Sequence, residues 1–421
     1  MDERTYRVTT LGCRVNRADS IAIEKELTRR GYRRAAEHSV PDIWIVNTCA
    51  VTGEGMKKSR KVARRCAASG AKVIVTGCGV DFQPSSFQVD GVDSLVPNRE
   101  KHALVSSCCD VTTEDAPDVV WSPEELVRAP VKVQDGCSRF CAYCVVPFLR
   151  PEPSSRTIGE VVEDVRVLEA SGAGEVILCG IDLGSYSDPS TGARLDALVE
   201  AVSSAAGKMW VRLSSIELSD VSDGLVRLMR EGAVCGHLHV PLQSGDAGVL
   251  EAMGRGYTPG EFARRVREIV SAFPEISITS DVMVGFPGED DKAFENSLAL
   301  VEDLAFWRLH VFKYSRRRGT RAFEFGDPVL SAEKARRAIA MRDLARAAAE
   351  RFHASQVGRI IPVLVEGVIE SEPGKLFGRA KSFAGAVFDG DPALIGSVTG
   401  VRVTSSGPEG VRGVMEKVRG Q

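Results

Sequence analysis

Short apolar runs alternate with longer amphipathic segments through the first hundred residues. Strands are predicted at Tyr6–Thr10, Ile43–Val46 and Lys72–Val75, because these runs are brief, rich in β-branched residues and bounded by polar positions. Helices are predicted between them, at about 16–30 and 55–69, and each is followed by a glycine that ends it. Since every crossover returns the chain to the same edge, this alternation predicts a parallel α/β sheet.

A second strand–helix alternation begins after a polar, aperiodic segment, residues 113–128, which is interpreted as a linker. Its six predicted strands are Val131–Gln134, Glu175–Cys179, Trp210–Leu213, His237–Pro241, Ser277–Val284 and Leu309–Tyr314. Helices are expected between them at about 158–170, 196–204, 219–230, 259–272 and 291–304. Six such units predict an open (βα)6 arrangement, a partial TIM barrel, with its functional residues in the loops after the strands.

The end of the chain has a different pattern, in which short alternating runs are separated by Gly and Pro. This pattern predicts a small antiparallel β-barrel. We therefore expect three domains, at 4–112, 129–353 and 354–421, of which the first two are α/β.

The composition and the charge distribution indicate where the protein acts and which class of partner it binds. The 421 residues are 43% hydrophobic with a net charge of −3, and no apolar run approaches the ~20 residues of a membrane span. The first residues do not form a signal peptide, so a cytoplasmic protein without a membrane partner is expected. Residues 55–72 contain seven Lys or Arg and no acid, and residues 308–351 contain twelve basic and five acidic residues. Such blocks favour RNA as a partner, although a solvated helix face is the alternative.

The chain contains eleven cysteines, which in a cytosolic protein favour metal or redox chemistry over disulfides. Cys137, Cys141 and Cys144 stand in a C-x3-C-x2-C spacing on one short loop. Three thiolates can hold an iron–sulfur cluster but leave one iron of a four-iron cluster without a protein ligand. An open metal position is where a substrate or cofactor binds.

A second group of cysteines follows the strands of the first domain. Cys13, Cys49 and Cys78 each come directly after one of its three predicted strands. Open parallel sheets place their ligands at the carboxyl edge, so the three thiols are expected to meet there as a second three-thiolate site. Three unrelated core cysteines are the alternative.

The loops after the later strands combine glycines, amides, hydroxyls and acids, which suits a polar cofactor over the mouth of the barrel. The candidate cofactor-binding residues are Tyr143, Gly180, Asp182, Ser215 and Gln243. His237 and His239 alternate along a predicted strand, and one is expected to face the core and the other the mouth.

The cysteine loop, with Tyr143 before its last cysteine and a partial barrel behind it, resembles radical S-adenosylmethionine enzymes. With Leu11-Gly-Cys13, Asn47-Thr-Cys49 and Thr76-Gly-Cys78 upstream, the whole chain resembles the methylthiotransferases, whose C-terminal barrel is of the TRAM type. The run Leu11–Asn16 is most similar to the branch that acts on threonylcarbamoyl-adenosine beside the tRNA anticodon. Two segments depart from the usual family pattern, which concerns substrate contacts and not the cluster ligands: Pro151-Glu-Pro-Ser154 follows Arg150 where an Arg-Gly pair and a basic run are usual, and Ser315-Arg-Arg-Arg-Gly319 replaces Ser-Pro-Arg-Pro-Gly.

The resemblance implies two 4Fe-4S clusters and S-adenosylmethionine bound at the open iron of the Cys137/Cys141/Cys144 site. It implies a tRNA substrate that gains a methylthio group at C2, a reductase as electron donor and a sulfur source. The candidate RNA contacts are Lys57, Lys58, Arg60, Lys61, Arg64, Arg316, Arg317 and Arg318. Isopentenyl-adenosine in tRNA, a ribosomal-protein aspartate, and a non-catalytic, metal-dependent RNA-binding protein are the alternatives.

Overall fold

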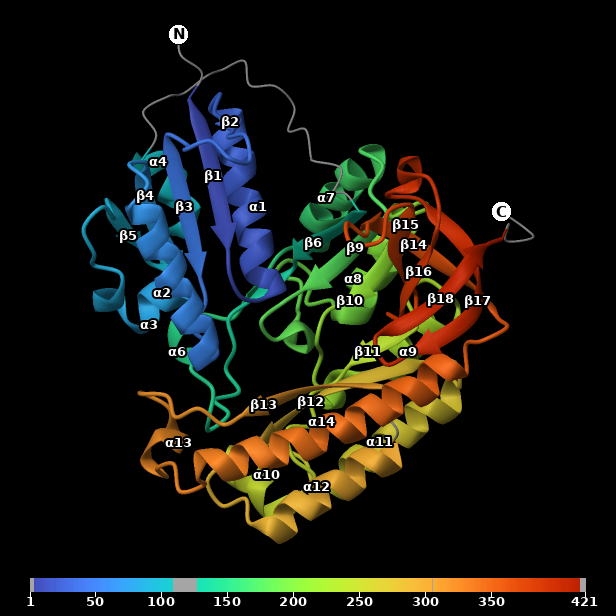
Figure 1. The fold of residues 1–421 in the computed structure, drawn as a ribbon. Helices are drawn as coiled ribbons and strands as arrows, with labels where there is room; N and C mark the ends of the chain where they lie inside the picture. The colour runs from blue at the N-terminus through green and yellow to red at the C-terminus, as the bar shows by residue number, and fades with distance from the viewer. Residues whose placement is uncertain (1–3, 109–126, 305, 417–421) are drawn as a thin grey trace.

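The computed structural model describes residues 4–108, 127–304 and 306–416, so the predicted linker lies almost wholly outside the described residues (Figure 1). The N-terminal part is a parallel five-stranded sheet in the order β2-β1-β3-β4-β5. Its strands are β1 (Thr5–Thr10), β2 (Arg33–Arg34), β3 (Ile43–Thr48), β4 (Lys72–Gly77) and β5 (Ser94–Val96). Its helices are α1 (Arg14–Arg29), α2 (Gly53–Ala67), α3 (Cys78–Phe82) and α4 (Leu104–Cys108). The three predicted strands and the parallel topology are confirmed.

The six predicted strands of the central part run parallel within their sheets, in the order in which they occur along the chain, but they form two three-stranded sheets. The first sheet contains β6 (Arg128–Lys132), β9 (Glu175–Cys179) and β10 (Trp210–Leu213), and the second contains β11 (His237–His239), β12 (Ser277–Val284) and β13 (Arg308–Lys313). The main helices are α7 (Ile158–Ala170), α8 (Leu195–Ala205), α9 (Asp223–Arg230), α10 (Ala247–Met253), α11 (Pro259–Ala272) and α12 (Asp291–Leu304). Short elements complete this part: β7 (Gln134–Asp135), α6 (Val146–Leu149), β8 (Ser154–Ser155) and α13 (Arg321–Glu324).

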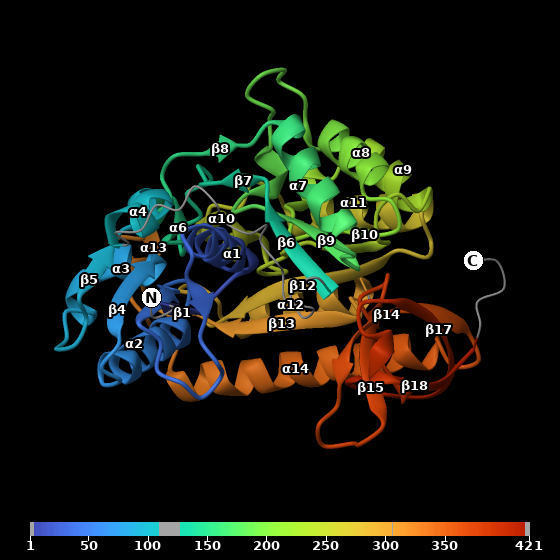
Figure 2. The same ribbon diagram turned by 90° about the horizontal axis from the view of Figure 1, so that it is seen from above.

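A long helix, α14 (Ser331–Ala354), was not predicted from the sequence. It packs along β13 and reaches the C-terminal barrel (Figures 1 and 2). Lys334, Arg337 and His353 are buried on this helix and interrupt the apolar stripe that would have identified it. No helix in the described part of the chain is long and apolar enough to cross a membrane.

The C-terminal part is a closed five-stranded barrel in the order β14-β15-β16-β18-β17. Its strands are β14 (Ile360–Val368), β15 (Lys375–Ala380), β16 (Gly385–Asp389), β17 (Val398–Gly407) and β18 (Gly410–Met415). The expectation of a wholly antiparallel barrel is wrong for one pair, because β16 and β18 are parallel. The 3-10 turn at Pro392–Leu394 carries the chain past β16, and the β17–β18 hairpin then places β18 between β16 and β17.

The turn between β15 and β16 docks the barrel onto the central strands at their amino ends. Arg212 donates from Nη1 to the carbonyl of Lys381 over 3.0 Å, and Ser277 donates to the carbonyl of Ser382 over 2.8 Å. The ring of Phe383 stacks on His237, with 4.9 Å between centroids. The C-terminal barrel therefore closes the amino edge of the central strands.

Candidate functional site

A cavity of about 800 Å³ lies where the N-terminal and central parts meet, and the predicted site residues gather around it. Its lining includes Cys13 and Cys49 from the N-terminal sheet and all three cysteines of the C-x3-C-x2-C loop. Cys78 is buried beside Cys13 and Cys49, and Nδ2 of Asn98 lies 3.6 Å from its sulfur. All five predicted cofactor-binding residues line the same cavity: Tyr143, Gly180, Asp182, Ser215 and Gln243.

The C-x3-C-x2-C loop is held by backbone hydrogen bonds on both sides. The N–H of Cys137 donates to the carbonyl of Arg150 over 3.3 Å, and that of Ala142 donates to Met253 over 2.7 Å. Gly136 has a φ of 75°, and a Cβ there would lie 2.4 Å from the carbonyl oxygen of Glu152. This close approach requires glycine at the start of the loop.

The upstream cysteines converge because each one follows a strand of the parallel sheet. Cys13 lies directly before α1, Cys49 follows β3 and Cys78 begins α3. Gly12 has a φ of 105°, and a Cβ on it would lie 2.8 Å from the Cβ of Cys49. Glycine thus lets the first two loops approach each other. Burial raises the pKa of the Cys49 thiol to about 11, so a metal must displace its proton at neutral pH.

The donor spacing distinguishes a cluster from a single ion. Two thiolates on one tetrahedral zinc lie about 3.8 Å apart, because each bond is about 2.3 Å long. Among the described residues only His239, Asp281 and His310 bring three possible ligand atoms within 4.8 Å of one another. Each thiolate of a four-iron cluster binds a different iron, so the wider spacing of the two cysteine groups fits such clusters better than zinc.

Cationic groups next to the cysteines support the same interpretation. Arg317 is buried close to Cys49, and its Nε and Nη2 atoms have no hydrogen-bond partner. At the other site, Nη1 of Arg255 lies 3.5 Å from the sulfur of Cys141 and also donates to Oε1 of Glu217 over 3.0 Å. An anionic thiolate cluster would satisfy the unpartnered nitrogens of Arg317 and attract the guanidinium of Arg255.

The candidate RNA-contact residues differ in how far their side chains are exposed. Lys57, Lys58, Lys61 and Arg64 are exposed on α2, where Lys58 also lines the cavity, and Arg60 is half-buried. Arg316 and Arg318 are exposed after β13. Arg317, in contrast, is buried over the ring of Phe82, so it does not face solvent with its two neighbours.

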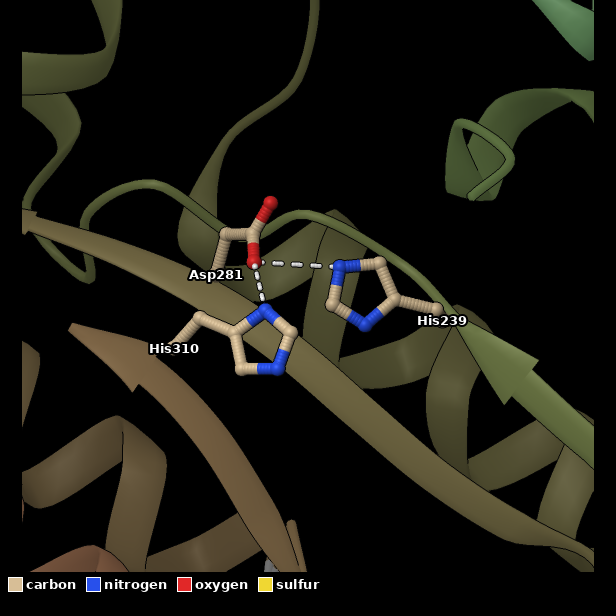
Figure 3. A group of neighbouring side chains, drawn as sticks. All are labelled: His239, Asp281 and His310. Atoms are coloured by element: carbon tan, nitrogen blue, oxygen red, sulfur yellow. Dashed lines mark ion pairs between the residues drawn. The ribbon is translucent and has the colours of Figure 1, made fainter. Parts of the chain in front are cut away.

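His239, Asp281 and His310 form a polar group that the sequence did not reveal (Figure 3). Oδ1 of Asp281 lies 3.0 Å from Nε2 of His239 and 3.3 Å from Nδ1 of His310. Burial would raise the pKa of Asp281, but the hydrogen bonds from these histidines lower it to about 2. His237 and His239 both contact the hydroxyl of Thr279, so the expectation that they face opposite ways is wrong. Residues two apart on a strand share a face.

Arginines gather around Phe383 at the end of the cavity that lies beside the amino ends of the central strands. The guanidinium carbons within 5.9 Å of its ring centroid are those of Arg14, Arg128, Arg212, Arg308 and Arg379. Glu175 pairs with Arg128 and Arg212, each over 2.8 Å, and Glu366 pairs with Arg128 and Arg379. Sequence reasoning missed this cluster because its members come from all three parts of the chain.

Comparisons with known proteins agree with this geometry. Residues 131–301 match the radical SAM superfamily, and residues 5–96 match uncharacterized protein family UPF0004. The chain is 33% identical to the threonylcarbamoyladenosine tRNA methylthiotransferase MtaB of Bacillus subtilis, over 96% of this chain and 94% of that protein. It is 32% identical to the tRNA-2-methylthio-N(6)-dimethylallyladenosine synthase of Chlorobium luteolum, over 96% and 95%. Its fold is similar to the radical S-adenosylmethionine methyltransferase TsrM of Kitasatospora setae, with a TM-score of 0.55, 14% identity, and 74% and 73% of the two chains covered.

Proposed function

This chain belongs to the radical S-adenosylmethionine tRNA methylthiotransferases, and on that premise we propose that its substrate is N6-threonylcarbamoyl-adenosine beside the tRNA anticodon, which it methylthiolates at C2. One observation carries the proposal. Cysteines from two separate three-cysteine groups line the same cavity, so a single adenine could face both groups at once. The relatives named for threonylcarbamoyladenosine include proteins from Chlamydia pneumoniae and Thermotoga maritima, at 33% and 32% identity.

The residues divide into a radical site and a sulfur site. Cys137, Cys141 and Cys144 would hold the cluster whose open iron binds S-adenosylmethionine, and Cys13, Cys49 and Cys78 would hold the second cluster. When bound, these groups supply the radical that removes hydrogen from the base and the sulfur and methyl groups that replace it.

The chain's own residues bind and orient the cofactor. The candidates that line the cavity are Tyr143, Gly180, Asp182, Ser215 and Gln243. Asp182 accepts from Nε of Arg139 over 2.8 Å, which holds a carboxylate beside Cys137. Gln243 has a φ of 68°, and its backbone bonds to Asp281 and Met283 keep it at the cavity wall. Burial raises the pKa of Tyr143 well above its usual value, so its phenol stays neutral.

The remaining assignments follow from the same premise. The domain limits are 4–112, 129–353 and 354–421, with the central part an open (βα)6 half-barrel and the last part a TRAM-like barrel. The enzyme acts in the cytoplasm with a reductase and a sulfur source as partners. The target base is flipped out of its stack to enter the cavity, while the basic face of α2, Arg316 and Arg318 contact the anticodon stem.

The test is nucleoside mass spectrometry of tRNA from cells that lack the gene. We expect 2-methylthio-N6-threonylcarbamoyl-adenosine to disappear, to return with the wild-type gene and to stay absent with Cys144→Ala. An unchanged level in the deletion strain would refute the assignment. Loss of the methylthio-isopentenyl nucleoside, or of a methylthio-aspartate in a ribosomal protein, would identify another branch of the family. An anaerobically purified protein with zinc but neither iron nor sulfide would indicate the non-catalytic alternative.

A further inference from the structure

Arg14 and Arg308 are two cations without a counter-ion at the amino edge of the cavity. Both line the cavity, and the guanidinium carbon of each lies 5.9 Å from the ring centroid of Phe383. The two carboxylates nearby, Glu175 and Glu366, already pair with other arginines. In the parts of the chain that the structure describes, neither Arg14 nor Arg308 has an ion pair or a side-chain hydrogen bond.

We propose that Arg14 and Arg308 bind the carboxylate on the N6 substituent of the target adenosine and thereby determine substrate specificity. The proposal rests on the proposed function and deepens it, because it says which chemical group of the base this chain selects. It predicts an N6 substituent that ends in an anion, rather than a hydrocarbon.

The two classes of substrate differ in the chemistry of their N6 substituent. A threonylcarbamoyl group carries a carboxylate, which a guanidinium binds through two charge-assisted hydrogen bonds. A dimethylallyl group is a hydrocarbon and can accept none. A substrate of the second kind would displace water from the arginines without replacing its hydrogen bonds, and that loss is costly.

The placement of the arginines fits the direction in which an adenine would lie. C2 and C6 flank N1 on one edge of adenine and their exocyclic bonds diverge, so a base that presents C2 to the clusters directs its N6 substituent to one side of them. Arg308 is the first residue of β13, at the amino edge, whereas the radical-site cysteines follow strands at the carboxyl edge. Arg14 directly follows Cys13, so the same short segment serves the sulfur site and this subsite.

Two other carboxylates or phosphates could reach these arginines, namely the carboxylate of S-adenosylmethionine and a phosphate of the RNA. S-adenosylmethionine would bind through its carboxylate at the cluster of Cys137, Cys141 and Cys144, where Arg255 and Arg139 are the neighbouring cations. The phosphate of a flipped nucleotide lies on the sugar side of the base, away from N6. The test must nevertheless separate all three sources.

The test measures binding by the full-length, cluster-loaded protein under anaerobic conditions. Two anticodon stem-loop RNAs are compared, one with N6-threonylcarbamoyl-adenosine and one with the corresponding threonine amide, which differ only in the carboxylate. The variants are Arg308→Gln, Arg14→Gln and the conservative Arg308→Lys. Arg166→Gln is the control, because Arg166 is an exposed arginine on α7. Fluorescence anisotropy gives both RNA affinities, and a separate titration gives that for S-adenosylmethionine.

We expect the wild type to bind the carboxylate RNA on the order of tenfold more tightly than the amide RNA. Either Gln variant should bring this ratio close to one, Arg308→Lys should keep part of it, and Arg166→Gln should not change it. An equal loss for both RNAs would assign the arginines to a phosphate and overturn the proposal. A loss confined to S-adenosylmethionine binding would assign them to the cofactor and overturn it as well. Failure of the wild type to methylthiolate the carboxylate RNA would refute the proposed function itself, and no variant is needed to see that.

Discussion

Arg150 donates a hydrogen bond from Nη2 to Oδ2 of Asp19 over 2.8 Å, although 131 residues separate them along the chain. Both side chains are buried. Asp19 lies on α1, the helix that begins after Cys13, and Arg150 follows the loop that contains Cys144. The pair therefore fixes the two three-cysteine sites relative to each other.

Replacing Arg150 should destabilise the protein strongly. Arg150→Met leaves the buried carboxylate of Asp19 with Lys101 and Lys132 only, and removing one partner of a buried pair costs about 3–5 kcal/mol. Arg156→Met is the matched control, because Arg156 pairs with Asp164 near the surface, where about 1 kcal/mol or less is expected. Urea unfolding of the cluster-loaded proteins measures both. Equal losses would show that the buried pair is unimportant.

Substitutions in the two cysteine groups should abolish different steps of the reaction. Cys144→Ala should abolish reductive cleavage of S-adenosylmethionine, whereas Cys13→Ala should permit cleavage without methylthiolation. Cys66→Ala is the control, since Cys66 is buried on α2 and belongs to neither group. Iron analysis should show about four irons fewer per chain in each ligand variant and no loss in the control. Loss of cleavage in both ligand variants would indicate that the upstream cluster is structural.

Arg317 should influence the reduction potential of the upstream cluster. A buried cation favours the more negative, reduced state, so Arg317→Gln should lower the potential. Arg318→Gln should leave it unchanged, because Arg318 is exposed. Redox titration followed by electron paramagnetic resonance compares the two. A larger shift in the Arg318 variant would contradict this role of Arg317.

The basic face of α2 should contribute salt-dependent RNA affinity. Lys57 and Lys61 are exposed and one helical turn apart, so both can face one RNA backbone. The slope of log affinity against log salt concentration is negative, and each Lys→Gln change should make it less negative by about 0.9 if the lysine contacts a duplex phosphate. Lys208→Gln, at an exposed position before β10, is the control. Slopes equal to that of the wild type would exclude α2 from the interface.

Asp281 should make the stability of the protein depend on acid pH. Its folded-state pKa of about 2 lies below the ordinary value, so its contribution is complete above about pH 4 and is lost as the pH falls toward 2. The loss amounts to about 2 kcal/mol. Urea unfolding of cluster-free protein should show this decrease in the wild type and less of it in Asp281→Asn. Asp223→Asn, a highly exposed carboxylate, should behave as the wild type.

Much of the fold follows from local patterns. Cys13, Cys49 and Cys78 could be placed together because each follows a strand, and parallel strands end at one edge. The barrel's parallel pair could not be predicted, because pairing of β16 with β18 depends on the path of a turn rather than on either strand's residues. Helix α14 was missed because buried polar residues such as Lys334 break its apolar periodicity.

The candidate site was predictable where one loop or one edge defines it. Gly180, Asp182 and Gln243 follow strands and line the cavity as expected. Asp281 and His310 were missed because only the strand register pairs them, and other polar residues, such as Ser280 and Lys313, lie in the same strands. The sequence could not show that Arg14 and Arg308 lie close together. Both contact Phe383, which belongs to a third segment of the chain.

The position of Phe383 near the end of the chain also determines when the cavity becomes complete during synthesis of the protein. The ribosome completes the N-terminal sheet and the central strands before it synthesises the turn between β15 and β16. Until that turn docks on Arg212 and Ser277, the amino edge of the cavity lacks its last wall. The segment that is synthesised last therefore supplies part of the wall of the cavity, which is complete only when the C-terminal barrel has folded and docked.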